Sequence, residues 1–186
     1  SEVEDLIRDL ERLLKEHDEL NKRSMEELEK LLKDLEKMVR DSLREAREIA
    51  ERVKETIKRT SDKEDLRRRL KKVKDDLDES HKDLARLLKE IEERIDRILR
   101  ENERHLEEIK REIKKILEEL ERAKKGEEKK LDEARKVLEE IKKRLEDSLR
   151  RLREEAERIK RELKRILDEH RKEIERIKKE IDEAAR

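Results

Sequence analysis

The stretch that decides the fold is LKEIEERIDRILRENERHLEEI, residues 88–109 of the chain. Uncharged positions recur there in alternating steps of three and four residues, and the positions between them are mostly Lys, Arg, Asp or Glu. This alternation is the spacing of a coiled-coil seam, because it keeps one face of each helix toward its partners. The seam positions are Leu88, Ile91, Ile95, Ile98, Asn102, His105 and Ile109. The stretch therefore predicts a long helix of a helical bundle, with two polar residues on its buried face.

The same spacing continues along the chain and is interrupted at two places. At the first, Ser61 is followed three residues later by Glu64, which is the pattern of a capping box at the start of a helix. At the second, Gly126 follows two lysines and precedes two acidic residues, as expected where one helix ends and the next begins. The pattern predicts helices at 2–59, 62–125 and 127–186.

Three helices of nearly equal length, joined by short connections, favour one architecture. We expect an all-α, up-down-up antiparallel three-helix bundle of nearly straight coiled-coil helices, each of about 60 residues. The bundle should form a single domain over residues 1–186. One alternative stays open, because Ser24 and Glu27 could also form a capping box and break the first helix at residues 21–23.

The composition fits long helices and argues against several classes of partner. Charged residues make up 61% of the chain, 57 basic and 57 acidic, and there is no Phe, Tyr, Trp or Cys. Without a basic excess or stacking rings, no nucleic-acid partner is expected. No apolar run approaches the roughly 18 residues of a membrane span, and no targeting signal is recognisable. We expect a soluble protein of unassigned localisation, and its start at Ser1 fits a recombinant chain.

Uncharged polar side chains gather on the predicted seam, where four histidines would rarely fall by chance. A buried polar group is costly unless it is hydrogen-bonded, so this placement predicts internal polar networks. The predicted network residues are His17, Asn21, Ser24, Ser42, Ser80, His81, Asn102, His105, Ser148 and His170.

Folding the chain back at its two breaks sorts these residues into two layers. The first layer is His17, His105 and Ser148, next to a pair formed by Asn21 and Asn102. The second layer is Ser42, His81 and His170, with Ser80 beside it. Two imidazoles and a hydroxyl can close a satisfied set of hydrogen bonds, provided that at least one imidazole is neutral. The layers are therefore either devices that fix helix register or a pH switch, because histidine changes its charge between about pH 5 and 8.

Other chemistries find less support in the sequence. A zinc site needs three or four converging ligands, and each layer offers two histidines and no carboxylate on the seam. Ser148 beside His105 could suggest a nucleophile and its base, but a packed bundle gives no substrate cleft. We therefore expect no metal, no cofactor, no small-molecule substrate and no enzymatic activity.

The chain resembles computationally designed helical bundles with buried hydrogen-bond networks. The resemblance rests on its restricted set of residue types (mainly Lys, Glu, Arg, Leu and Ile), its helices of equal length and its separate layers of His, Asn and Ser. In such bundles histidines are placed to make assembly respond to pH. The resemblance covers the whole chain. It implies a structural scaffold or conformational switch without a natural substrate.

A second interpretation is a binding or oligomerisation module that uses another apolar face of the first helix. This face lies beside a seam that includes Ile7 and Met38. Its residues are Leu6, Leu13, Leu20, Met25, Leu32 and Val39. A three-helix core about three-sevenths wide would bury them internally, which favours a monomer over a homo-oligomer.

Overall fold

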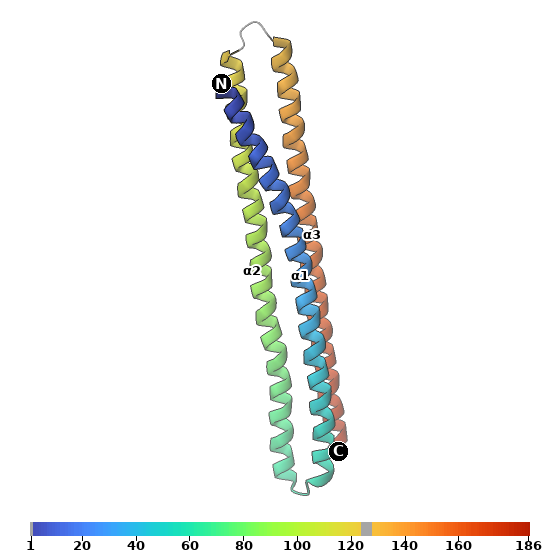
Figure 1. Ribbon diagram of the computed structural model, residues 1–186. Coiled ribbons are helices and arrows are strands. Elements are labelled where there is room, and N and C mark those ends of the chain that lie inside the picture. Colours follow the sequence, from blue (N-terminus) through green and yellow to red (C-terminus); the bar gives the residue numbers. More distant parts are fainter. Residues whose placement is uncertain (1, 124–127) are drawn as a thin grey trace. The chain divides into compact units, whose positions relative to one another are not determined.

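The computed structural model describes residues 2–123 and 128–186. Within these ranges the chain forms three α-helices and no strand (Figure 1). The helices are α1 (Glu2–Arg59), α2 (Lys63–Ala123) and α3 (Glu128–Ala184). They form a three-helix bundle, which confirms the predicted fold class.

Compact packing divides the chain into two units, which are described separately. Unit 1 comprises Ser1–Leu28 and Arg94–Arg158, and unit 2 comprises Glu29–Glu93 and Ile159–Arg186. Each unit contains parts of all three helices. The expectation of a single domain over 1–186 stays a prediction.

Ion pairs between helices fix the helix directions in unit 1. Arg94 of α2 pairs with Glu27 of α1, whereas His105, further along α2, lies near Glu16, which is earlier in α1. In unit 2, Lys74 and Asp78 of α2 pair with Asp182 and Lys178 of α3, again in reverse order. Within each unit, therefore, α2 runs antiparallel to the helix that it pairs with.

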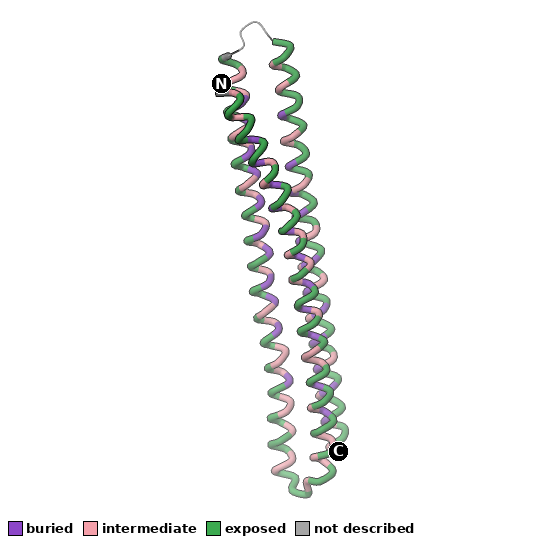
Figure 2. Tube along the Cα trace, viewed as in Figure 1, coloured by how far each residue is buried: buried purple, intermediate pink, exposed green. Residues whose placement is uncertain are grey.

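The cores of both units are aliphatic, and buried positions recur along each helix (Figure 2). The main core cluster of unit 1 consists of Leu10, Leu13, Leu106, Ile109, Ile113, Ile116, Leu138, Leu145 and Leu149. The corresponding cluster of unit 2 consists of Ala46, Ala50, Leu77, Ile174, Ile177 and Ile181. The two alanines of α1 have short side chains, so they allow the helices around them to approach closely.

The buried face of α1 differs in part from the predicted seam. Ile7 and Met38 were expected on the seam, but they are 40% and 45% exposed. Four residues of the neighbouring stripe are buried instead, namely Leu13, Leu20, Leu32 and Val39. A helix that contacts two partners needs a wider apolar stripe than a two-helix seam, so the centre of burial moves toward the second stripe.

Helix α1 is continuous through residues 21–23, so the alternative break there is wrong. Ser24 does not cap a new helix, because its hydroxyl accepts a hydrogen bond from Nδ2 of Asn102. A tertiary contact thus uses the side chain that could have served as a cap.

The start of α2 lies one residue later than predicted, and its cap is Asp62, not Ser61. Oδ1 of Asp62 accepts hydrogen bonds from the backbone N–H of Glu64 at 3.0 Å and of Asp65 at 3.5 Å. Its carbonyl accepts the first helical bond from the N–H of Leu66. Both Ser and Asp are good N-caps, but the carboxylate also interacts favourably with the positive end of the helix dipole.

Replacing Asp62 with Ala is expected to lower the free energy of unfolding by about 1 kcal/mol, because two backbone donors lose their acceptor. Ser61→Ala is the matched control and should change it by less than about 0.3 kcal/mol. Urea unfolding of both variants measures the difference. A larger loss in the Ser61 variant would restore the capping box that the sequence predicts.

The predicted cap at Gly126 and the predicted helix ends at 125 and 127 lie outside the described residues. Helix α3 ends at Ala184, two residues before the predicted end at 186. No described helix contains a stretch that is both long and apolar enough to cross a membrane.

Candidate functional site: the buried histidine layers

One residue from each helix meets in a hydrogen-bonded layer in unit 2, which we call the relay layer: Ser42, His81 and His170. His170 of α3 is 0% exposed, and both of its ring nitrogens have partners. Its Nε2 lies 2.9 Å from Oγ of Ser42 on α1, and its Nδ1 lies 3.0 Å from Nδ1 of His81 on α2. The structure thus brings together the three residues that the sequence placed in the second layer.

The relay layer is satisfied when both imidazoles are neutral. In the Nδ1–Nδ1 contact one ring must donate and the other must accept. If His170 donates from Nδ1, its Nε2 accepts from the Ser42 hydroxyl; if His81 donates, Nε2 of His170 donates to Ser42 instead. Both tautomer sets use every nitrogen of His170.

Burial is the largest effect on both rings, and it favours their neutral forms. Burial, followed by the proximity of His81, lowers the pKa of His170 to about 4. The pKa of His81 is also lowered, first by burial and then by the nearby Arg171. Three carboxylates oppose this shift, those of Asp78, Asp168 and Glu175.

Ser80 lies outside the relay layer. Its Oγ donates to the backbone carbonyl of Leu77 at 2.8 Å, within its own helix. A serine inside a helix often bonds back to the preceding turn in this way, so it does not need a partner from another helix.

His17 and His105 meet in unit 1 in a different way, and we call this pair the stacked layer. The ring centroids are 6.0 Å apart, with an angle of 20° between the planes. All four ring nitrogens are buried without a hydrogen-bond partner in the part of the chain that the structure describes. Oε2 of Glu16 lies 3.6 Å from Nε2 of His105, which is longer than a hydrogen bond.

The electrostatic surroundings of the stacked layer also differ. The pKa of His17 is lowered, first by burial and then by repulsion from His105, while Asp18 opposes the shift. His17 is only 3% exposed, so a proton on its ring would lack both water and an acceptor.

Ser148 and Asn21 do not join the layers to which the sequence assigned them. Both are half-buried, and neither side chain forms a hydrogen bond with any described residue. Asn102 donates instead to Oγ of Ser24 and to the carbonyl of Ile98, both at 2.8 Å, while its Oδ1 is buried and unpaired. The expected Asn21–Asn102 pair is wrong because Ser24, not Asn21, occupies the buried face of α1.

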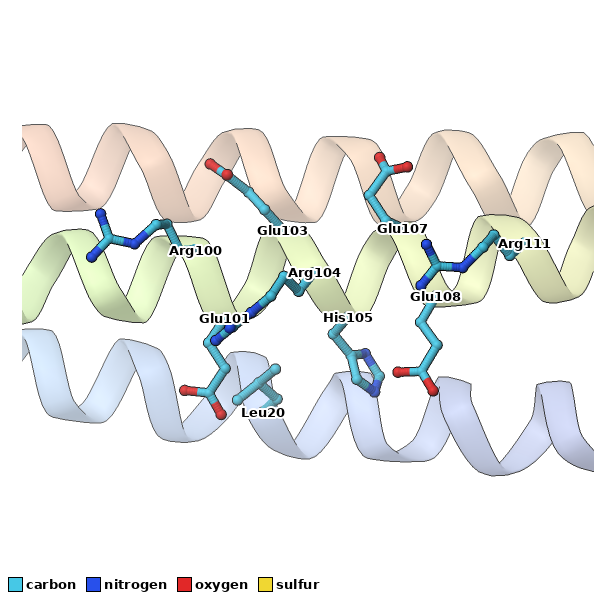
Figure 3. Close-up of a pocket in the computed structure, with 9 residues that line it drawn as sticks. All are labelled: Leu20, Arg100, Glu101, Glu103, Arg104, His105, Glu107, Glu108 and Arg111. Atoms are coloured by element: carbon cyan, nitrogen blue, oxygen red, sulfur yellow. The ribbon is translucent and has the colours of Figure 1, made fainter.

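A groove of about 720 Å³ opens beside His105 in unit 1 (Figure 3). Leu20 of α1 contributes to its wall, and the other lining residues belong to α2. These are Arg100, Glu101, Glu103, Arg104, His105, Glu107, Glu108 and Arg111. In Figure 3 the imidazole of His105 points toward α1, as do the carboxylates of Glu101 and Glu108. Sequence reasoning missed this groove, because its charged residues look like ordinary solvated helix surface.

The relay layer has the order of a nucleophile, a base and an orienting group, but it lacks the other requirements of acyl transfer. A base whose pKa is about 4 abstracts a hydroxyl proton poorly. Ser42 lies in the middle of α1, where helical bonds already use the backbone N–H groups that could stabilise an oxyanion. In the described ranges, no group of three or more His, Cys, Asp or Glu residues could hold a metal ion.

The hydrogen bonds of the relay layer predict an energetic coupling. His170→Leu should lower the free energy of unfolding by about 1–3 kcal/mol, because it leaves the Ser42 hydroxyl and Nδ1 of His81 without a partner. Ser42→Ala should cost less in the His170→Leu background than in the parent chain. A double-mutant cycle measured by urea unfolding gives this coupling, and additive losses would contradict the Ser42–His170 bond.

Comparison with known proteins informs the fold. No family model matches the chain, and no curated protein matches it. A solved structure described as a computationally designed three helix bundle is similar, with a TM-score of 0.75 and 21% sequence identity. The similarity covers 99% of this chain and 92% of that chain. The chain therefore shares the three-helix bundle fold of that designed protein.

Proposed function

We propose that the chain is a designed structural scaffold, without a natural activity, whose buried histidines make its stability depend on pH. The designed origin is supported by the restricted composition and by the likeness in fold to a computationally designed three helix bundle. The uncharged polar residues add to this support, because they lie mainly on the helix seams. Four of them are buried, namely His17, Ser24, Asn102 and His170.

The observation that carries the pH dependence is the environment of His170. The ring is fully buried, both of its nitrogens are hydrogen-bonded, and its neighbour is a second imidazole. This arrangement stabilises the neutral ring and disfavours protonation. A charged ring would lose its hydration, and a positive charge on the neighbouring histidine would repel it. Ser or Asn alone would fix helix register without this dependence.

The test compares this chain with a variant in which His17, His81, His105 and His170 are all Asn. Both are unfolded in urea at about pH 7.5 and about pH 5, where histidine changes its charge and most carboxylates do not. A larger acid-induced loss in the parent chain supports a switch. Equal losses would leave the layers as register devices only.

The monomer is part of the same proposal. Burial of Leu13, Leu20, Leu32 and Val39 within the chain leaves little apolar surface on the second face of α1 for a partner helix. We expect a mass of 22.9 kDa in solution at neutral pH. Light scattering that gives a multiple of this mass would favour the alternative, an oligomerisation module.

A further inference from the structure

We infer that acid opens unit 2 before unit 1, with the relay layer as the proton-sensing element because a second proton breaks the hydrogen bond between its two rings. This inference rests on the proposed pH dependence and assigns it to one of the two layers. It rests on a difference in geometry, because each layer pairs two imidazoles but only one pair is hydrogen-bonded.

The relay layer can hold one proton but not two. With one added proton, the 3.0 Å contact becomes an N⁺–H···N bond between His81 and His170, and the neutral ring keeps its role. A second proton places an N–H group on both Nδ1 atoms. The bond is then lost, and two positive rings face each other with centroids 5.3 Å apart.

The charged residues around the relay layer favour a positive charge on His81 but not on His170. His81 is half-buried, and Asp78, Asp168 and Glu175 act on it against Arg171. On α1, Asp41 beside Ser42 pairs with Arg44, and Arg47 pairs with Glu173 of α3. Burial and His81 lower the pKa of the fully buried His170, and among the described residues no carboxylate opposes them.

The stacked layer has no internal hydrogen bond to lose, and it has an acceptor at its edge. A proton on Nε2 of His105 faces Oε2 of Glu16 on α1 at 3.6 Å, which is within ion-pair distance. The groove beside it is also lined by charged residues of α2, among which three arginines oppose four glutamates: Arg100, Arg104 and Arg111, and Glu101, Glu103, Glu107 and Glu108. From α3, Glu146 and Arg153 bring no uncompensated charge, because they pair with Lys110 and Glu103.

A second proton, on His17, lacks an acceptor, but it breaks no hydrogen bond in the stacked layer. Asp18 favours this charge, and the ring centroids are 6.0 Å apart, against 5.3 Å in the relay layer. The layer with the better hydrogen bonds at neutral pH is thus the one that loses more on acidification.

Hydrogen exchange of the full chain, read by mass spectrometry of its fragments, tests the order. Protection factors are corrected for the intrinsic effect of pH on exchange and compared at about pH 7.5 and about pH 5. Segments around Ser42, His81 and His170 should lose protection at least about tenfold, and those around His17 and His105 less than about threefold.

Two matched variants show which histidine layer causes the acid-induced loss of protection. His81→Leu/His170→Leu should abolish the acid-induced loss in unit 2, and His17→Leu/His105→Leu should leave it unchanged. Loss in unit 1 first, equal loss in both units, or a loss in unit 2 that persists without His81 and His170 would each overturn the inference. If the variant with four Asn keeps the full pH dependence, the proposed function itself fails.

Discussion

Lowering the pH from about 7.5 to about 5 is expected to remove about 2 kcal/mol of unfolding free energy through His170 alone. Its pKa is about 4 in the folded chain, against an ordinary value of 6.5. Between these values the unfolded chain binds the proton and the folded chain does not, so acid favours unfolding. The contribution is complete above about pH 6.5, falls as the pH decreases, and is lost below the folded pKa of about 4.

Other groups change the size of this effect but not its sign. The pKa values of His17 and His81 are also lowered, so both add to the loss in the same window. Asp168, whose pKa is lowered from 3.8 by Arg171 and Lys172, titrates mainly below that window. The total over the histidines is less than a sum of independent sites, because neighbouring rings titrate together.

The measurement is urea unfolding of the parent chain and of the variant with four Asn at both pH values. The variant should lose less than about 0.5 kcal/mol, because its carboxylates remain charged in both conditions. A single His170→Asn variant should recover most of the difference. If this variant responds to acid as the parent does, His170 is not the sensor.

The fold was predictable from the sequence because helix period and helix ends are local properties. The end of α1 at Arg59 follows from the polar break after it, and the structure agrees. The start of α2 was missed by one residue, because Ser61 and Asp62 are both competent caps and the choice depends on the backbone path between the helices.

For the polar layers, the sequence predicts which helical turns face each other. Folding the chain at its breaks correctly puts Ser42, His81 and His170 at one height. The rotation of α1 about its own axis is set by packing against two helices at once, and a repeat of three and four residues does not reveal it. This rotation exposes Ile7 and Met38 and buries Ser24 in preference to Asn21.

Hydrogen bonding within each layer was the least predictable feature. Both layers contain two histidines, and the sequence treats them alike. A bond between two rings requires nitrogens within about 3 Å along a good line, and small differences in ring position decide this. His81 and His170 meet that condition, whereas His17 and His105 stack without meeting it.

Replacing both His17 and His105 with Leu is therefore expected to stabilise the chain at neutral pH by about 2 kcal/mol or more. The double variant removes four buried ring nitrogens that have no partner in the described structure and supplies aliphatic groups of similar size. Unsatisfied buried polar atoms cost free energy, and apolar replacements of both members of a polar pair avoid that cost.

The matched control is His81→Leu/His170→Leu, which removes hydrogen bonds that are formed and leaves the Ser42 hydroxyl unpaired. This variant should be neutral or less stable than the parent by up to about 2 kcal/mol. Urea unfolding at about pH 7.5 compares both variants with the parent chain. If the two variants shift the urea midpoint of unfolding equally, the stacked and the hydrogen-bonded layer contribute the same free energy, which would contradict this prediction. If only the His17/His105 variant gains stability, the stacked layer destabilises unit 1 at neutral pH, whereas the hydrogen bonds of the relay layer offset the cost of burying its polar atoms.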